Sequence, residues 1–141
     1  EIKEYAFYNC ESLKSVEIPS SVTGVGDYAF SGCTGLTSVT IEQGVTSIGK
    51  YAFVGCTGLT QITIPSSVTS IGSSAFLDCT GLTEITIPSS VTSIGNDAFY
   101  YCTGLKTVYY GGTETEWSGI SIGSGNSYLT SATIYYNSKQ N

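Results

Sequence analysis

One spacing recurs along this chain of 141 residues and limits what it can fold into: the same residue types return every 23 positions. Alanine, phenylalanine, cysteine and leucine each form such a column. The columns are Ala6, Ala29, Ala52, Ala75 and Ala98; Phe7, Phe30, Phe53, Phe76 and Phe99; Cys10, Cys33, Cys56, Cys79 and Cys102; and Leu13, Leu36, Leu59, Leu82 and Leu105. A unit this short cannot bury its apolar residues alone, but stacked units align the columns into one continuous core. The sequence therefore predicts a repeat solenoid.

Each unit begins with the pattern L-x-x-[VI]-x-I, which alternates apolar and polar residues. The alternation of Leu59, Ile62 and Ile64 predicts a short strand. Pro65 follows and ends it, because proline has no N–H to donate to a further ladder bond. The β-branched stretch 68–71 then predicts a second short strand.

The second half of the unit predicts a short helix. Asp27, Ser73 and Asn96 stand where a helix N-cap accepts a backbone N–H, although Lys50 breaks this column. The A-F-x-x-C segment that follows has room for one or two helical turns. A glycine suited to a left-handed helix C-cap comes next, at Gly35, Gly58, Gly81 and Gly104. We therefore expect units of strand, turn, second strand and short helix, stacked into a right-handed, curved α+β solenoid.

The N-terminal unit is incomplete, because Ile2 falls in the column of Val25 and Ile48, in the middle of a unit. We expect further repeats upstream in the parent protein, since solenoids need capping units. The core-column residues Ile2, Ala6, Phe7 and Cys10 would then be uncovered here. An open end invites pairing with another copy, so we expect weak self-association through it.

The pattern decays after residue 110, and we divide the chain into repeats over 1–110, a degenerate capping unit over 111–137 and a tail over 138–141. We expect Trp117 in the isoleucine column, with Ile120 and Ile122 in place of the Ala-Phe pair. A last strand, one residue out of register, is expected from Leu129, Ala132 and Ile134.

The charge balance excludes several classes of protein. With 5 lysines, no arginine, 11 carboxylates and a net charge of −6, the chain lacks the basic surface that nucleic acid requires. It has no histidine, which excludes Ser–His, Cys–His and zinc–histidine chemistry. No apolar run approaches the ~20 residues that span a bilayer, so we expect no direct membrane insertion.

The unit that runs from Leu59 to Gly81, LTQITIPSSVTSIGSSAFLDCTG, resembles the bacterial leucine-rich repeats called BspA-like, the type described in treponemal surface proteins. The resemblance covers residues 1–110 directly. It implies a secreted or cell-surface protein that takes part in adhesion or other extracellular interactions, and it supplies no shared catalytic motif. The chain departs from the pattern at 42–44, where Glu-Gln-Gly replaces Pro-Ser-Ser, and at 111–112.

The cysteine column permits two further interpretations, disulfides and a soft-metal ladder. Stacked rungs bring equivalent Cα atoms to roughly 5 Å, within the disulfide range, but equivalent side chains point in parallel. Each cysteine also follows a phenylalanine by three residues, on the same buried side. We therefore expect free, buried thiols and no metal.

The other chemical patterns are weak. The G-x-G-x-x-A sequence at 24–29 lacks the long crossover helix of a dinucleotide site. Glu17 and Glu84 lie three rungs apart, roughly 14 Å, beyond the ~5–9.5 Å of a glycosidase pair. Glu114 and Glu116 are expected in a solvated turn. We expect no enzyme activity and no cofactor.

The outward positions of the first strand remain as a candidate binding face. They are Ser15, Glu17, Ser38, Thr40, Gln61, Thr63, Glu84, Thr86, Thr107 and Tyr109, with Ser131 and Thr133 in the last strand. The candidate binding residues are Gln61, Thr63, Glu84, Thr86, Thr107 and Tyr109, joined by Tyr100 and Tyr101 as aromatic anchors. Serine and threonine also suit strands that bind nothing. We expect a non-catalytic extracellular module that binds protein or glycoprotein; the alternative is a structural spacer or self-associating array.

Overall fold

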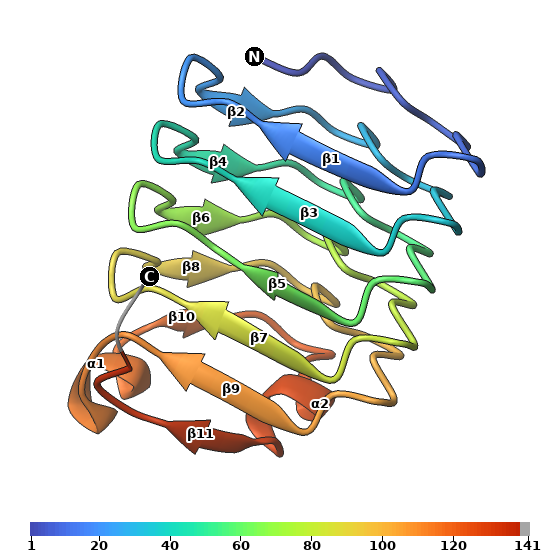
Figure 1. Cartoon of the computed structure of the whole chain (residues 1–141). Coiled ribbons are helices and arrows are strands. Elements are labelled where there is room, and N and C mark those ends of the chain that lie inside the picture. Colours follow the sequence, from blue (N-terminus) through green and yellow to red (C-terminus); the bar gives the residue numbers. More distant parts are fainter. Residues whose placement is uncertain (139–141) are drawn as a thin grey trace.

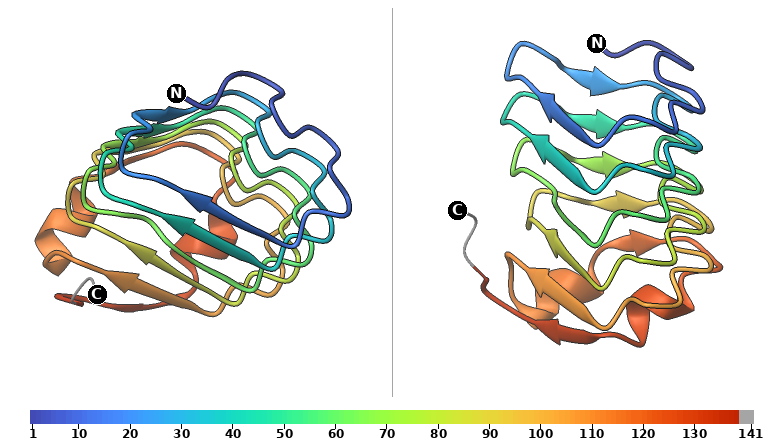
Figure 2. Two further views of the ribbon diagram at one scale, coloured as in Figure 1. Left: turned by 45° about the horizontal axis from the view of Figure 1, so that its top comes forward. Right: turned by 45° about the vertical axis from the view of Figure 1, so that its right-hand side comes forward.

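The computed structural model describes residues 1–138, which form a solenoid of stacked rungs (Figure 1). One side carries the longer strands β1 (Ser15–Ile18), β3 (Ser38–Ile41), β5 (Gln61–Thr63), β7 (Glu84–Ile87), β9 (Thr107–Tyr110) and β11 (Thr133–Tyr135). The opposite side carries the two-residue strands β2 (Gly24–Val25), β4 (Ser47–Ile48), β6 (Ser70–Ile71), β8 (Ser93–Ile94) and β10 (Ser121–Ile122). Figure 2 shows the two strand columns running along the stack, with the turns of each rung between them.

The strands pair in parallel, and the pairing confirms the 23-residue register. Ile48 lies beside Ile71 in β4 and β6, and Ile85 lies beside Val108 in β7 and β9. Paired strands therefore place their inward apolar residues above one another. The predicted solenoid is confirmed.

The core is a set of continuous columns, of which the phenylalanines form the largest. Neighbouring rings from Phe7 to Phe99 lie parallel, with centroids 5.2–5.3 Å apart and interplanar angles of 3–10°. Phe30, Phe53 and Phe76 are fully buried between neighbours. Phe7 has a neighbour on one side only and is 41% exposed.

The predicted short helix is wrong: the A-F-x-x-C segment forms consecutive turns. The Cys33 N–H donates to the Phe30 carbonyl three residues back at 3.2 Å. The Phe30 N–H, by contrast, donates to the Ala52 carbonyl of the next rung at 2.8 Å. A helix would direct each N–H to the carbonyl four residues back. Here alternate N–H groups bond to the neighbouring rung, so the segment stays a chain of turns.

Positive φ angles also mark these turns. Tyr28 has φ of 59° and Gly32 has φ of 76°, each the third residue of a hydrogen-bonded turn, as in type II turns. The equivalent residues in the other units have the same sign of φ: Tyr5, Tyr51, Ser74 and Asp97, and Asn9, Gly55, Asp78 and Tyr101. The apolar residues have the same spacing in a helical turn and in these consecutive turns, which explains why the sequence predicts a helix here.

The residues assigned to helix caps have other roles. The Asp27 Oδ1 accepts a hydrogen bond from the Lys50 N–H of the next rung at 2.8 Å, and the Asn96 Oδ1 accepts one from the Ser124 N–H at 3.0 Å. None of the four glycines expected as left-handed caps has positive φ. A Cβ on Gly58 would instead lie 2.9 Å from the Thr34 carbonyl oxygen of the preceding rung. These glycines let adjacent rungs approach closely.

The C-terminal unit contains helix α1 (Glu114–Ser118), so the turn expected at Glu114 and Glu116 is wrong. Ile122 pairs with Ile94 and so occupies the isoleucine column in which Trp117 was expected. Trp117 instead lies in α1 and packs edge-on against Tyr110, with centroids 5.0 Å apart. The inserted helix lengthens this unit, which explains why the 23-residue register failed here.

The last strand is also displaced from its expected register, because Ile134 pairs with Val108 after helix α2 (Ser127–Thr130). Ser138, expected to begin a tail, donates its N–H to the Tyr110 carbonyl at 2.9 Å. The rest of that tail, 139–141, lies outside the described residues. Among residues 1–138, no helix is long and apolar enough to cross a membrane. That this unit caps the stack stays a prediction.

The phenylalanine column yields a stability prediction. Phe53→Ala should lower the free energy of unfolding by about 3–5 kcal/mol, because it leaves a cavity between two buried rings. Phe7→Ala should cost much less, because this ring is 41% exposed. Urea unfolding followed by circular dichroism measures both. Equal losses for the two variants would contradict the open N-terminal rung.

Candidate binding surface

The long strands form a face on which two rows of outward side chains cross the rungs. Strand pairing places Gln61 beside Glu84 and Glu84 beside Thr107. In the second row, Thr86 lies between Thr63 and Tyr109. The structure thus brings six of the eight candidate residues into one surface, which we call the strand face. Their role in binding stays a prediction.

Tyr100 and Tyr101 do not join this surface, because they lie in the turns between β8 and β9. Their rings contact each other, with centroids 4.3 Å apart, and are 39% and 51% exposed. The hydrogen bond between the two tyrosines is the main cause that raises the pKa of Tyr100. They form a separate aromatic pair.

Tyr135 also belongs to the strand face, although it is not among the residues predicted from the sequence. It lies beside Tyr109 in β11, with ring centroids 5.6 Å apart, and is 53% exposed. Thr133 is outward as expected, whereas Ser131 ends α2 and lies outside the strand. The signal was present in the sequence, since Thr-Val-Tyr-Tyr at 107–110 returns as Thr-Ile-Tyr-Tyr at 133–136.

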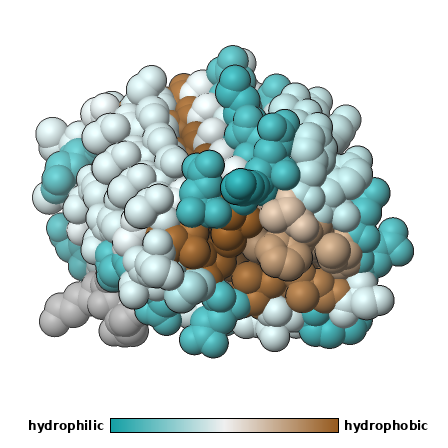
Figure 3. Space-filling model, turned by 90° about the horizontal axis from the view of Figure 1, so that it is seen from above, coloured by the Kyte–Doolittle hydropathy of each residue, from teal (hydrophilic) through white to brown (hydrophobic). Residues whose placement is uncertain are grey.

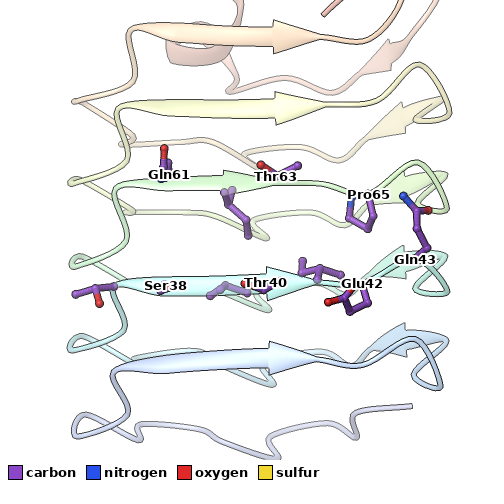
Figure 4. Close-up of a pocket in the computed structure, with 11 residues that line it drawn as sticks. Ser38, Thr40, Glu42, Gln43, Gln61, Thr63 and Pro65 are labelled. Carbon is purple, nitrogen blue, oxygen red and sulfur yellow. The ribbon is translucent and has the colours of Figure 1, made fainter. Parts of the chain in front are cut away.

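A groove of about 700 Å³ crosses the strand face between β3 and β5 (Figure 4). Its polar lining comes from Ser38, Thr40, Gln61 and Thr63, with the Glu42 carboxylate near one end. Hydroxyls, amides and one carboxylate can exchange hydrogen bonds with a ligand. Within residues 1–138, no three histidine, cysteine, aspartate or glutamate side chains converge as metal ligands.

The cysteines are free, as predicted, and four of the five are buried. The Cys56 Sγ donates to the Phe30 carbonyl of the preceding rung at 3.2 Å, and Cys79 repeats this contact with Phe53 at 3.1 Å. Burial raises the pKa of Cys56 to about 12, so the thiol stays protonated at neutral pH. A protonated, buried thiol is not a nucleophile, and the column is structural.

Comparison with known proteins agrees with this architecture. The family described as "BspA type Leucine rich repeat region" matches residues 1–123 in 6 copies. No curated protein sequence matches the chain significantly.

The similar solved structures include the following three proteins. A leucine-rich cell surface protein from Faecalibacterium prausnitzii has a TM-score of 0.83 and 39% identity, over 85% of this chain and 32% of that one. The leucine-rich repeat protein of Treponema pallidum has a TM-score of 0.75 and 39% identity, over 77% of this chain and 50% of that one. A leucine-rich repeat protein from Bacteroides ovatus has a TM-score of 0.75 and 33% identity, over 92% of this chain and 31% of that one.

The chain thus spans 31–50% of the length of these relatives. The repeat length, the stacked columns and the family match over residues 1–123 agree with one another. This chain belongs to the BspA-type leucine-rich repeat family.

Proposed function

We propose that this chain is a non-catalytic module that binds a protein or glycoprotein outside the cell through its strand face. The observation that carries the proposal is the stacked pair of the half-buried Tyr109 and the exposed Tyr135 at one end of that face. Tyrosine offers a large, rigid contact area and a hydroxyl, which makes it a frequent anchor in interfaces. The pair lies next to the polar side chains of Thr86 and Thr107.

The solenoid also favours binding through its rigidity. Strands tied into ladders lose little further conformational freedom when a ligand docks, so less of the binding energy is spent on ordering. An extracellular location is supported by the cell surface protein of F. prausnitzii, with 39% identity to this chain. The alternative is a spacer that presents other domains and binds nothing itself.

The tyrosine pair gives a direct test. Tyr109→Ala combined with Tyr135→Ala should weaken saturable binding to immobilised mucin or extracellular-matrix protein at least about tenfold, a loss of ~1.4 kcal/mol. Biolayer interferometry measures the affinity. The matched control is Tyr28→Ala with Tyr51→Ala, a pair stacked at 4.7 Å in the turns, which should leave binding unchanged.

Two results would contradict the proposal. Absence of saturable binding to every matrix protein and mucin would favour the spacer. Loss of binding in Tyr100→Ala with Tyr101→Ala, and not in the strand-face variant, would move the site to the turns.

We also propose that copies of this chain associate weakly through the N-terminal end. One observation favours this self-association. Figure 3 shows an apolar patch on this end of the stack, ringed by polar residues. Tyr5, Phe7 and Tyr8 are 48%, 41% and 48% exposed there. Apolar surface of this kind is buried when two copies meet.

Sedimentation velocity over a concentration series tests the association. The unmodified chain should sediment faster as its concentration rises, and Ile2→Lys combined with Phe7→Ser should abolish that dependence. A monomer at all concentrations, with or without the substitutions, would show that the end is sufficiently shielded.

A further inference from the structure

The ladder of the strand face is interrupted between two neighbouring strands. β1 pairs with β3, and β5, β7, β9 and β11 pair in order, but β3 and β5 belong to separate sheets. On the opposite side of the same rungs, β4 pairs with β6. The turns are also joined, since the Phe30 N–H donates to the Ala52 carbonyl at 2.8 Å. The interruption is therefore confined to one face.

The missing bonds can be identified by comparison with the intact junctions. The Thr37 N–H donates to the Lys14 carbonyl at 2.9 Å, and the Thr83 N–H donates to the Thr60 carbonyl at 2.9 Å. Within residues 1–138, no corresponding bond joins Thr60 to Thr37. At the other end of the strand Pro65 has no N–H, but Pro88 lacks one equally at the intact junction of β5 with β7, so the proline does not cause the interruption.

The interruption coincides with the groove between β3 and β5, which reaches the core. The inward residues Val39 and Ile41 line it and are 8% and 7% exposed, whereas Ile85 and Ile87 in β7 are fully buried. Figure 4 shows the outward side chains of the two strands on either side of the groove. The groove thus has polar walls, unpaired strand edges and an apolar strip at its base.

One end of the groove is closed by side chains. Here Glu-Gln-Gly at 42–44 replaces the Pro-Ser-Ser turn. The Ser66 hydroxyl donates to the Gln43 Oε1 at 3.1 Å, and the Gly44 N–H donates to the Ser67 hydroxyl at 3.0 Å. These contacts hold the two rungs together at the turn while the strands themselves are not bonded.

We propose that this groove binds an extended polypeptide segment, which adds a strand between β3 and β5. Unpaired N–H and C=O groups along a strand edge are matched by another peptide backbone, the basis of β-strand addition. Neighbouring strands lie ~4.8 Å apart, so the two edges must separate on this face to admit the segment. The pairing of β4 with β6 keeps the other side closed, and the contacts of Gln43 and Gly44 with the next rung must open together with the strands.

The lining also defines the chemistry of the segment. Small hydroxyl side chains on both walls leave room for alternating β-branched and small residues, as in the strands of this chain. Glu42 and the net charge of −6 favour a segment without acidic residues. This inference rests on the proposed binding function and names the part of a protein ligand that this groove takes.

The probe is a fluorescein-labelled peptide with the sequence of residues 36–41, LTSVTI, followed by lysine. Its anisotropy should rise saturably with protein concentration. The same peptide with N-methyl groups on alternate amides keeps its side chains but loses donors, and should bind at least about tenfold more weakly. Equal binding of the two peptides, or no binding of either, would overturn the proposal.

A disulfide that locks β3 to β5 across the groove provides a second test. Thr40→Cys with Thr63→Cys, made with Cys10→Ser, should form a disulfide on oxidation when their Cα atoms come within ~4.4–6.8 Å. The oxidised form should lose peptide binding at least tenfold, and reduction should restore it. The matched control is Ser70→Cys with Ser93→Cys, at paired positions of β6 and β8, where oxidation should change nothing. Equal peptide binding by the oxidised and reduced lock would overturn the proposal.

Hydrogen exchange on the unmodified chain covers the case in which the lock variant does not fold. The amides of β3 and β5 that face the groove should exchange faster than those of β7, and the peptide should slow them. Slow exchange without peptide would show that the groove is closed and would overturn the inference. The proposed function is tested separately. If the unmodified chain binds the peptide but neither mucin nor matrix protein, the proposed function is wrong and the peptide groove remains.

Discussion

Backbone hydrogen bonding between rungs at a fixed spacing of 23 residues is the constraint on which the rest of this molecule depends. Each rung has too few residues to bury a core alone, so its apolar side chains are covered only by identical positions above and below. The turn segment shows how strong this constraint is. Alternate N–H groups there bond to the next rung, which prevents the short helix that the local sequence favours.

The columns follow from the same register. Phenylalanines stack because the ladder holds equivalent Cα atoms one strand spacing apart, and the cysteines fill the remaining space beside them. Four of the thiols donate to a phenylalanine carbonyl of the preceding rung, so the cysteine column adds rung-to-rung hydrogen bonds of its own. Glycines such as Gly58 and side chains such as Asp27 complete the contact between rungs. The outward side chains take no part in the core, and the register aligns them into rows that a ligand can contact.

The repeat made much of the fold predictable. It located the core columns, both strands of each unit, and free buried cysteines. It could not distinguish helix from turns, because both bury the A-F-x-x-C residues in the same spacing; the difference lies in where the backbone N–H groups bond. It also failed where α1 is inserted, which displaced Trp117, Ile122 and Ile134 from their expected columns. The groove between β3 and β5 depends on separation of two strands, a property that residue type does not encode.

Amide hydrogen exchange of the phenylalanine column tests the coupling between rungs most directly. The N–H of each of Phe7, Phe30, Phe53 and Phe76 donates to an alanine carbonyl of the next rung at 2.7–2.8 Å. Coupled rungs open from the exposed end, so protection should rise from Phe7 through Phe30 to a maximum at Phe53 and Phe76. Equal protection of Phe7 and Phe53, or protection without order along the stack, would contradict a structure stabilised from rung to rung.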